Sequence, residues 1–252
     1  MNCNVPTDIC FSFEGFCARG GKTDDHKDGW GIAFFEGLGC RVFLDDTPSS
    51  TSPVAALVRQ YPIKSMNVIA HIRKATVGPV GLENCHPFKR ELWGRYWVFA
   101  HNGDVPTLPF EHGGIYRSVG QTDSERAFCL LLNTIRQRFP DRKPPIADLY
   151  AVLREVTADI AQHGIFNYLL SDGEHFFAHC STKLCYLVRQ APFAAAHLID
   201  EDLTVDFQEL TTPSDHVAII ATTSLTDNEA WTPIQPGELL VFQDGTPLLA
   251  LG

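Results

Sequence analysis

The stretch Tyr96-Trp97-Val98-Phe99-Ala100-His101-Asn102-Gly103 joins an apolar run to a polar turn. Residues 96–100 are typical of a buried strand, and the His-Asn-Gly that follows is typical of a turn. Asn-Gly is also the commonest pair in short hairpin turns. An Asn side-chain amide beside a Gly backbone N–H suits an oxyanion hole equally well, because that site needs two donors aimed at one point. The neighbouring motifs decide between the two interpretations.

Two helices are predicted downstream of this strand. The first begins near Thr122, because Thr122 and Glu125 have the spacing of a helix capping box. Its buried face consists of apolar residues at helical spacing, namely Phe128, Leu131, Leu132, Ile135 and Phe139. The second helix is predicted over residues 146–163, with Gly164 as its stop. Its apolar face consists of Ile146, Leu149, Leu153, Val156 and Ile160.

Strands return after the second helix. Residues 166–170 and 176–180 flank Asp172-Gly173, which is a strong hairpin signal, and apolar runs follow at 184–188, 217–221 and 239–242. Upstream, the apolar runs 9–16 and 29–36 flank a charged loop, residues 19–28, which reads as a solvated hairpin connection or as a pocket wall. Residues 45–53 read as a surface loop. Strands, then two helices, then strands predict an α+β fold with largely antiparallel sheets.

Three further polar residues lie after a predicted strand, in a turn and at a predicted helix start. Arg73 follows the apolar strand at 68–72 and could grip a carboxylate with two parallel hydrogen bonds, although a surface salt bridge is an equal alternative. His86 lies in a turn closed by Pro87, where a structural histidine is the commoner interpretation. Asp123 lies in the first turn of the first helix, where the helix dipole favours a carboxylate. Its alternative role is to receive a substrate ammonium.

A guanidinium and a carboxylate together suit the two ends of an amino-acid zwitterion. The Asn-Gly turn would then lie at the far end of such a ligand, against a side-chain acyl group. This combination suggests acyl transfer or amide hydrolysis on glutamine or on a γ-glutamyl compound.

An ordered set of motifs resembles one enzyme family. The set comprises Asn4-Val5-Pro6-Thr7-Asp8, His26-Lys27-Asp28-Gly29-Trp30-Gly31, His71-Ile72-Arg73-Lys74-Ala75-Thr76-Val77-Gly78, Asn84-Cys85-His86-Pro87, His101-Asn102-Gly103, Thr122-Asp123-Ser124-Glu125 and the stretch from Ala221 to Trp231. It resembles the class II glutamine amidotransferases, which are N-terminal-nucleophile (Ntn) hydrolases, and most closely their stand-alone YafJ-like branch. The resemblance covers nearly the whole chain.

The resemblance implies a fold and a set of site residues. The implied fold is a four-layer αββα sandwich of two mainly antiparallel sheets, with residues 1–252 forming a single glutamine amidotransferase type-2 domain. Arg73 matches the residue that binds the glutamine α-carboxylate, and Asp123 matches the residue that holds the α-ammonium. Thr76 and His86 match residues of that pocket, whereas Asn102 and Gly103 match the oxyanion hole.

The nucleophile is where the sequence departs from the family. The family nucleophile is a cysteine directly after the initiator Met, and its own α-amine serves as the base. This chain begins Met1-Asn2-Cys3, and Cys3 aligns several residues past the nucleophile position. We therefore expect the nucleophilic strand to be missing from these 252 residues, and none of the eight cysteines to replace it. The expected consequences are an inactive chain and a partly open sheet edge or groove beside Asn102.

Three functions remain open at this point. The first is a glutamine amidotransferase-like amidohydrolase that works through a cysteine thioester. A separate protein would accept the ammonia, or the chain would simply hydrolyse its substrate. The second is a non-catalytic module that binds glutamine and regulates a partner. A metal-dependent hydrolase is disfavoured because paired His/Asp ligand motifs are lacking, and no cofactor is expected.

The composition bears on the partners and the cellular location of the chain. The chain has 30 acidic and 20 basic residues, a formal net charge of −10 and no basic stripe, so nucleic acid and anionic membrane surfaces are poor partners. No apolar run reaches the roughly 18 residues of a membrane span, and no secretory signal is visible. The eight cysteines are scattered and form no Cys-x-x-Cys pair, which suggests reduced thiols in a cytoplasm.

Overall fold

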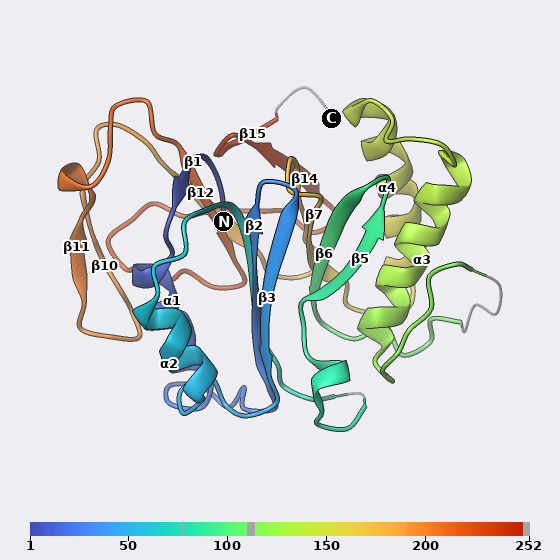
Figure 1. Cartoon of the computed structure of the whole chain (residues 1–252), viewed down its shortest axis with the longest axis horizontal. Helices are drawn as coiled ribbons and strands as arrows, with labels where there is room; N and C mark the ends of the chain where they lie inside the picture. The colour runs from blue at the N-terminus through green and yellow to red at the C-terminus, as the bar shows by residue number, and fades with distance from the viewer. Residues whose placement is uncertain (77, 110–113, 249–252) are drawn as a thin grey trace.

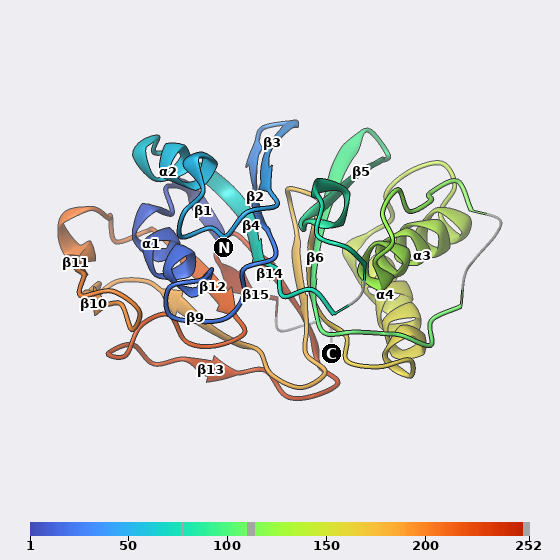
Figure 2. The same ribbon diagram turned by 90° about the horizontal axis from the view of Figure 1, so that it is seen from below.

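The computed structural model describes residues 1–76, 78–109 and 114–248, and the predicted α+β sandwich is confirmed. Two antiparallel sheets lie face to face, and a pair of helices covers the outer face of each (Figure 1). The second view, from below, separates the four layers: α1 and α2, the two sheets, and then α3 and α4 (Figure 2). No helix among the described residues is long and apolar enough to cross a membrane.

The first sheet has seven strands, and its central strands come from both ends of the chain. Their spatial order is β13 (Thr232–Pro233), β9 (Cys185–Arg189), β12 (Val217–Ala221), β1 (Asn2–Thr7), β4 (Ser65–Ile72), β2 (Trp30–Glu36) and β3 (Gly39–Asp45). Every pairing in it is antiparallel. The N-terminal strand β1 therefore lies between β12 and β4, in the middle of the sheet.

The second sheet has six strands and contains residues 96–102. Its order is β15 (Thr246–Pro247), β14 (Leu239–Gln243), β8 (Phe176–His179), β7 (Asn167–Ser171), β6 (Arg95–Asn102) and β5 (Phe88–Leu92). The predicted hairpin at Asp172-Gly173 is confirmed, because β7 and β8 pair across it. A small separate sheet joins β10 (Ala195–His197) to β11 (Thr204–Asp206), and two 3-10 turns are η1 (Leu82–Asn84) and η2 (Phe207–Glu209).

Three hydrophobic layers hold the sandwich together. One lies between the first sheet and the helices α1 (Cys10–Arg19) and α2 (Pro53–Gln60), and it includes Phe13, Trp30 and Phe34. A second lies between the two sheets. The third joins the second sheet to α3 (Asp123–Arg138) and α4 (Ile146–Ala161). Burial of these apolar faces on both sides of each sheet is the main stabilisation of the fold.

The start of α3 confirms half of the predicted capping box. The Thr122 hydroxyl accepts a hydrogen bond from the Glu125 N–H at 3.2 Å, as the spacing predicted. The Glu125 carboxylate instead accepts from Val119 N–H at 3.0 Å and Gly120 N–H at 2.7 Å, and it pairs with Arg90. Glu125 thus fixes the loop before the helix, and this loop leads into Asp123.

Two N-terminal helices depart from the sequence expectations. Residues 10–19 form α1, so the loop after it joins a helix to β2 and is not a hairpin connection. The run had too few residues to separate helical from strand periodicity, and Phe13 and Cys17 turn out to lie on one buried helical face. Helix α2 was not predicted; Ser52 caps it, accepting from Ala55 N–H at 3.2 Å, and Pro53 is its first residue.

Candidate active site

A groove of about 350 Å³ opens in the first sheet and reaches down to the second, with Asn102 in its wall. We call it the Asn102 groove. Its lining comes from the first sheet, from α1 and from the second sheet, and includes Met1, Phe13, His71, Asn102, Asn167 and Thr222. A groove beside Asn102, as expected from the sequence, is therefore present.

The Asn102-Gly103 turn is held from both sheets. Asn102 ends β6 opposite Asn167 of β7, whose side chain donates to the Asn102 carbonyl at 3.0 Å. The Asn102 amide itself is exposed and donates from Nδ2 to Thr222 Oγ1 at 3.0 Å, at the end of β12. An amide NH2 has two N–H donors, so this contact orients Asn102 while the second donor remains for a ligand.

Gly103 has a backbone conformation that a side chain would not tolerate. Its φ is +143°, and a Cβ placed there would lie 2.2 Å from the Ile165 carbonyl oxygen. The turn thus places the Gly103 N–H next to Asn102 by bringing two backbones into close contact, which only glycine permits.

His101 connects this turn to α3 and to His86. Its Nδ1 lies 2.9 Å from Ser124 Oγ, its Nε2 lies 2.9 Å from the Ile165 carbonyl oxygen, and its backbone N–H donates to His86 Nδ1 at 3.3 Å. The His86 ring packs on His71 with ring centroids 4.2 Å apart. Burial, followed by the neighbouring His71, holds the pKa of His86 well below its ordinary value. His86 therefore supports the turn from behind as a neutral ring.

Arg73 leaves β4 just past Ile72 and turns into a loop. Its guanidinium is buried and donates to the carbonyl oxygens of Pro79 and Gly78, both at 3.1 Å, and of Asp28 at 3.4 Å. Thr76 lies on the same loop and is exposed. In this structure Arg73 thus binds main-chain carbonyl oxygens of its own loop and of Asp28, which lies just before β2.

Asp123 is the first residue of α3 and is also buried. Its carboxylate accepts from Val105 N–H at 2.6 Å and from Ser124 N–H at 2.9 Å. Asn84 links the two regions: its side chain donates to the Pro79 carbonyl at 3.0 Å and accepts from Gln121 N–H at 2.9 Å. Hydrogen bonds through Pro79, Asn84 and Gln121 thus connect Arg73 with the segment that leads into Asp123. Neither lines the Asn102 groove.

None of the eight cysteines lines the Asn102 groove. The Cys3 thiol lies 3.3 Å from the carbonyl oxygens of Ser65 and of Met66, at the start of β4, whereas the groove extends toward Ile72 at the end of that strand. Burial raises the pKa of Cys3 above its ordinary value, which keeps the thiol protonated and unreactive.

Sequence reasoning missed three residues at the groove. Thr222 orients Asn102, Asn167 holds the turn, and His71 lines the groove with a buried Nδ1 that has no hydrogen-bond partner among the described residues. Thr222 and His71 lay inside the motifs quoted above, but nothing local indicated a role. Asn167 belongs to none of these motifs, and it lies opposite Asn102 only because of the register between β7 and β6.

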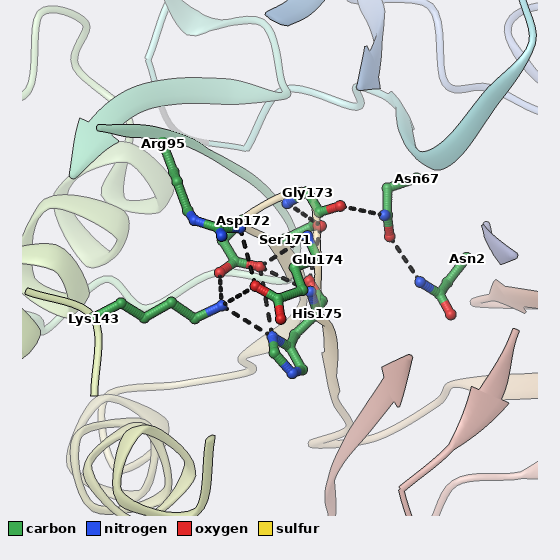
Figure 3. Close-up of polar contacts among 9 residues, drawn as sticks. All are labelled: Asn2, Asn67, Arg95, Lys143, Ser171, Asp172, Gly173, Glu174 and His175. Carbon is green, nitrogen blue, oxygen red and sulfur yellow. Dashed lines mark hydrogen bonds and ion pairs between the residues drawn. The ribbon is translucent and has the colours of Figure 1, made fainter. Parts of the chain in front are cut away.

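A second polar cluster, at the β7–β8 turn, was also missed (Figure 3). Ligand atoms of Asp172, Glu174 and His175 lie within 4.8 Å of one another, close enough to hold a metal ion. Lys143 already supplies a cation there: its ammonium pairs with Asp172, lies 3.0 Å from Glu174 Oε2 and lies 3.1 Å from His175 Nδ1. Figure 3 shows the lysine directed into the middle of the three side chains. We interpret the cluster as an ion-pair network that fastens α4's preceding loop to the second sheet.

The chain is similar to known proteins over nearly its whole length. The sequence profile of the class-II glutamine amidotransferases matches residues 1–251. The chain is 52% identical over 242 residues to YafJ of Escherichia coli (strain K12), and the match covers 96% of this chain and 95% of that protein. The name of that relative assigns it provisionally to the glutamine amidotransferases. A crystal structure of a predicted glutamine amidotransferase from Pseudomonas aeruginosa superposes with a TM-score of 0.79 and 47% identity, covering 98% of this chain and 97% of that one.

A more distant structure shares the fold alone. The glutamine phosphoribosylpyrophosphate amidotransferase of B. subtilis matches with a TM-score of 0.57 at 13% identity, over 95% of this chain and 45% of that one.

Proposed function

Because this chain belongs to the class-II glutamine amidotransferases, we propose that it cleaves the side-chain amide of glutamine or of a γ-glutamyl compound. The observation that carries the proposal is the Asn102-Gly103 turn at the wall of the Asn102 groove. Its side-chain amide is exposed, oriented by Thr222, and adjacent to a glycine N–H. The Asn102 amide lies at the wall of the groove and the Gly103 N–H follows it in the chain, and two such donors are suited to stabilise the oxyanion of a tetrahedral intermediate.

Arg73 and Asp123 are our candidates for binding the amino-acid end of the substrate. Their charges are opposite, both are buried, and both are bonded to main-chain groups. In this structure the Arg73 guanidinium binds the carbonyl oxygens of residues 28, 78 and 79, so an approaching substrate α-carboxylate would compete with these contacts. We therefore propose that the loop after β4, including Thr76, rearranges when substrate binds.

The nucleophile in this proposal is a cysteine thiol that attacks the amide carbon, forms a thioester and releases ammonia or an amine; water then hydrolyses the thioester. None of the eight thiols of this chain is suited to that step, because none lines the Asn102 groove. The attacking cysteine would have to carry its own free α-amine as the base.

The fate of the ammonia is a separate part of the proposal. In either case water hydrolyses the thioester, and the ammonia is either passed to a partner protein or released to solvent. The proposed localisation is cytoplasmic, since the described thiols are all unpaired.

The test uses a chain in which five residues, Cys-Thr-Val-Leu-Ala, are joined ahead of Met1 so that the cysteine is the first residue. We call it the Cys-extended chain. Its release of glutamate is measured with glutamine and with a panel of γ-glutamyl amides. We expect hydrolysis by this chain, none by the matched chain with serine in place of the added cysteine, and none by the 252 residues alone. Activity of the 252 residues that Cys3→Ala abolishes would contradict the proposal, as would an inactive Cys-extended chain.

The absence of a thiol from the groove favours a second function for the 252 residues as they stand, a non-catalytic glutamine-binding module. Calorimetry of this chain with glutamine tests it. Glutamine binding that Arg73→Ala and Asp123→Asn each abolish, with no hydrolysis by this chain or by the Cys-extended chain, would support the module over the enzyme.

A further inference from the structure

A second hollow, with a volume of about 770 Å³, opens beside the Asn102 groove, and we call it the β9 cleft. Its walls come from the turn before β9, from the segment after β12 and from residues 231–236 around β13. Thr222, which bonds to the Asn102 amide, lines both hollows, so the cleft begins at the side chain proposed to act on the substrate carbonyl. The lining residues common to both are Arg19, Asp24, Leu184, Thr222 and Thr223.

The order of the first sheet places the β9 cleft and Arg73 on opposite sides of β1. Strands β12, β9 and β13 lie on one side of β1, whereas β4, which leads directly into Arg73, lies on the other. A substrate whose γ-carbonyl lies against Asn102 and whose amino-acid end is directed to Arg73 therefore directs the group on its amide nitrogen to the cleft. Ammonia needs no such space, whereas the cleft has the size of a small-molecule site, which is roughly 300–1,000 Å³.

Lys183 is a cation of the β9 cleft that is available for a ligand. Its side chain is exposed and forms no ion pair within the described part of the chain. The cleft's other charged groups have partners: Arg19 pairs with Asp200 at 2.7 Å, and Asp24 lies 3.0 Å from the His26 ring. The cleft is therefore suited to an anionic group, and a carboxylate is the anion that a leaving amino acid or peptide carries.

Asn167 fixes the turn that leads into Lys183 and the Asn102 turn at the same time. Its Nδ2 donates to the Asn102 carbonyl at 3.0 Å and to Thr182 Oγ1 at 2.9 Å. Its Oδ1 accepts from Ser181 N–H at 2.8 Å and from Thr182 N–H at 3.0 Å. One buried side chain thus holds the backbone before Lys183 at a set position relative to the proposed oxyanion donors.

The wall around β13 is apolar. Trp231, Pro233 and Ile234 line it. The Trp231 ring is partly buried, and its indole N–H donates to Thr226 Oγ1 at 3.0 Å, which fixes the ring. An aromatic ring held in this way is suited to pack against an apolar side chain of a ligand.

We propose that the β9 cleft binds the leaving group of the substrate, and that this group is an amino acid or short peptide with an apolar side chain and a free carboxylate that pairs with Lys183. The preferred substrate is then a γ-glutamyl amino acid or peptide, and not glutamine. The nucleophilic thiol gives its proton to its own α-amine and bonds to the γ-carbonyl carbon. The C–N bond then breaks, and the leaving nitrogen takes that proton and departs as a free amine. The inference rests on the proposed function.

Three substrates of the Cys-extended chain test the leaving group. γ-Glutamyl-phenylalanine and γ-glutamyl-phenethylamide differ only in the carboxylate of that group, and glutamine lacks the group altogether. We expect kcat/KM for the first to exceed that for the second at least about fivefold, because only the first can pair with Lys183. It should exceed that for glutamine at least about tenfold, because contacts with the cleft lower the barrier only for a substrate that reaches it.

Variants of Lys183 identify the cation. The readout is the ratio of kcat/KM for γ-glutamyl-phenylalanine to that for γ-glutamyl-phenethylamide within each chain. Lys183→Gln should bring this ratio to within about twofold of one, whereas Lys183→Arg, which keeps the charge, should stay within about threefold of the parent. Lys64→Gln is the matched control, because Lys64 is exposed, precedes β4 and lies outside the cleft, and it should leave the ratio unchanged. The parent ratio in Lys183→Gln would overturn the inference.

The failure of this inference can be told apart from failure of the proposed function. A Cys-extended chain that hydrolyses glutamine and both amides equally well overturns the inference and leaves the proposed function in place. A Cys-extended chain that hydrolyses none of them contradicts the proposed function. Calorimetry with the chain that carries serine in place of the added cysteine then tests the cleft by itself. γ-Glutamyl-phenylalanine should bind at least about fivefold tighter than γ-glutamyl-phenethylamide, and Lys183→Gln should remove the difference; equal binding in the parent would overturn the inference.

Discussion

Among single residues, Gly103 has a backbone conformation that requires glycine, and its N–H is one of the two proposed oxyanion donors. Gly103→Ala would force a Cβ against the Ile165 carbonyl at a φ of +143°. We expect a loss of at least about 2 kcal/mol in the free energy of unfolding, measured by urea denaturation. Gly94→Ala is the matched control, because Gly94 also has a positive φ, +72°, but no atom lies within 4 Å of its Cβ position. Equal losses in the two variants would show that the contact with Ile165 is not what excludes a side chain.

Buried histidines give the stability a pH dependence whose sign can be worked out. Burial lowers the pKa of both His86 and His101 in the folded chain, whereas in the unfolded chain each titrates near its ordinary value of about 6.5. Below that pH the unfolded chain binds more protons, so stability falls as the pH drops from about 6.5 toward the lower folded pKa values.

His86→Asn isolates one of these contributions. Asparagine keeps an acceptor for His101 N–H but cannot titrate, so the variant should lose less stability between pH 7 and pH 5 than the parent chain. We expect a difference on the order of 1–2 kcal/mol in unfolding free energy. Identical pH profiles would mean that His86 is not held neutral by burial.

At the scale of elements, the start of α3 controls where Asp123 lies. Thr122→Ala removes the acceptor for Glu125 N–H and should cost about 1 kcal/mol in unfolding free energy, with Thr122→Ser as the control that restores it. The same change should weaken substrate binding in the Cys-extended chain, because Asp123 is the next residue. An unchanged KM would separate the cap from the proposed ammonium site.

The two long helices and the hairpin were predictable because their signals are local. Thr122, the apolar spacing of α3 and α4, and Asp172-Gly173 each act within one element. Helix α1 was not predicted, because the apolar run at residues 9–16 was too short to separate helical from strand periodicity.

At the scale of the whole molecule, the residue types of the candidate site followed from the sequence, but their bonding did not. Asn102 bonds to Thr222, 120 positions away, and Arg73 binds main-chain carbonyls of its own loop. Such contacts depend on which strands pair and in which register, which no local pattern specifies.

If an amide carbonyl is attacked in the Asn102 groove, loss of the Asn102 side chain should slow the chemical step. Steady-state hydrolysis of glutamine by the Cys-extended chain is compared with that of the same chain carrying Asn102→Ala. We expect kcat to fall by roughly 10²–10³ while KM changes little, because the side chain acts on the oxyanion and not on the bound substrate. A kcat within about twofold of the parent, in a variant that still folds, would contradict it.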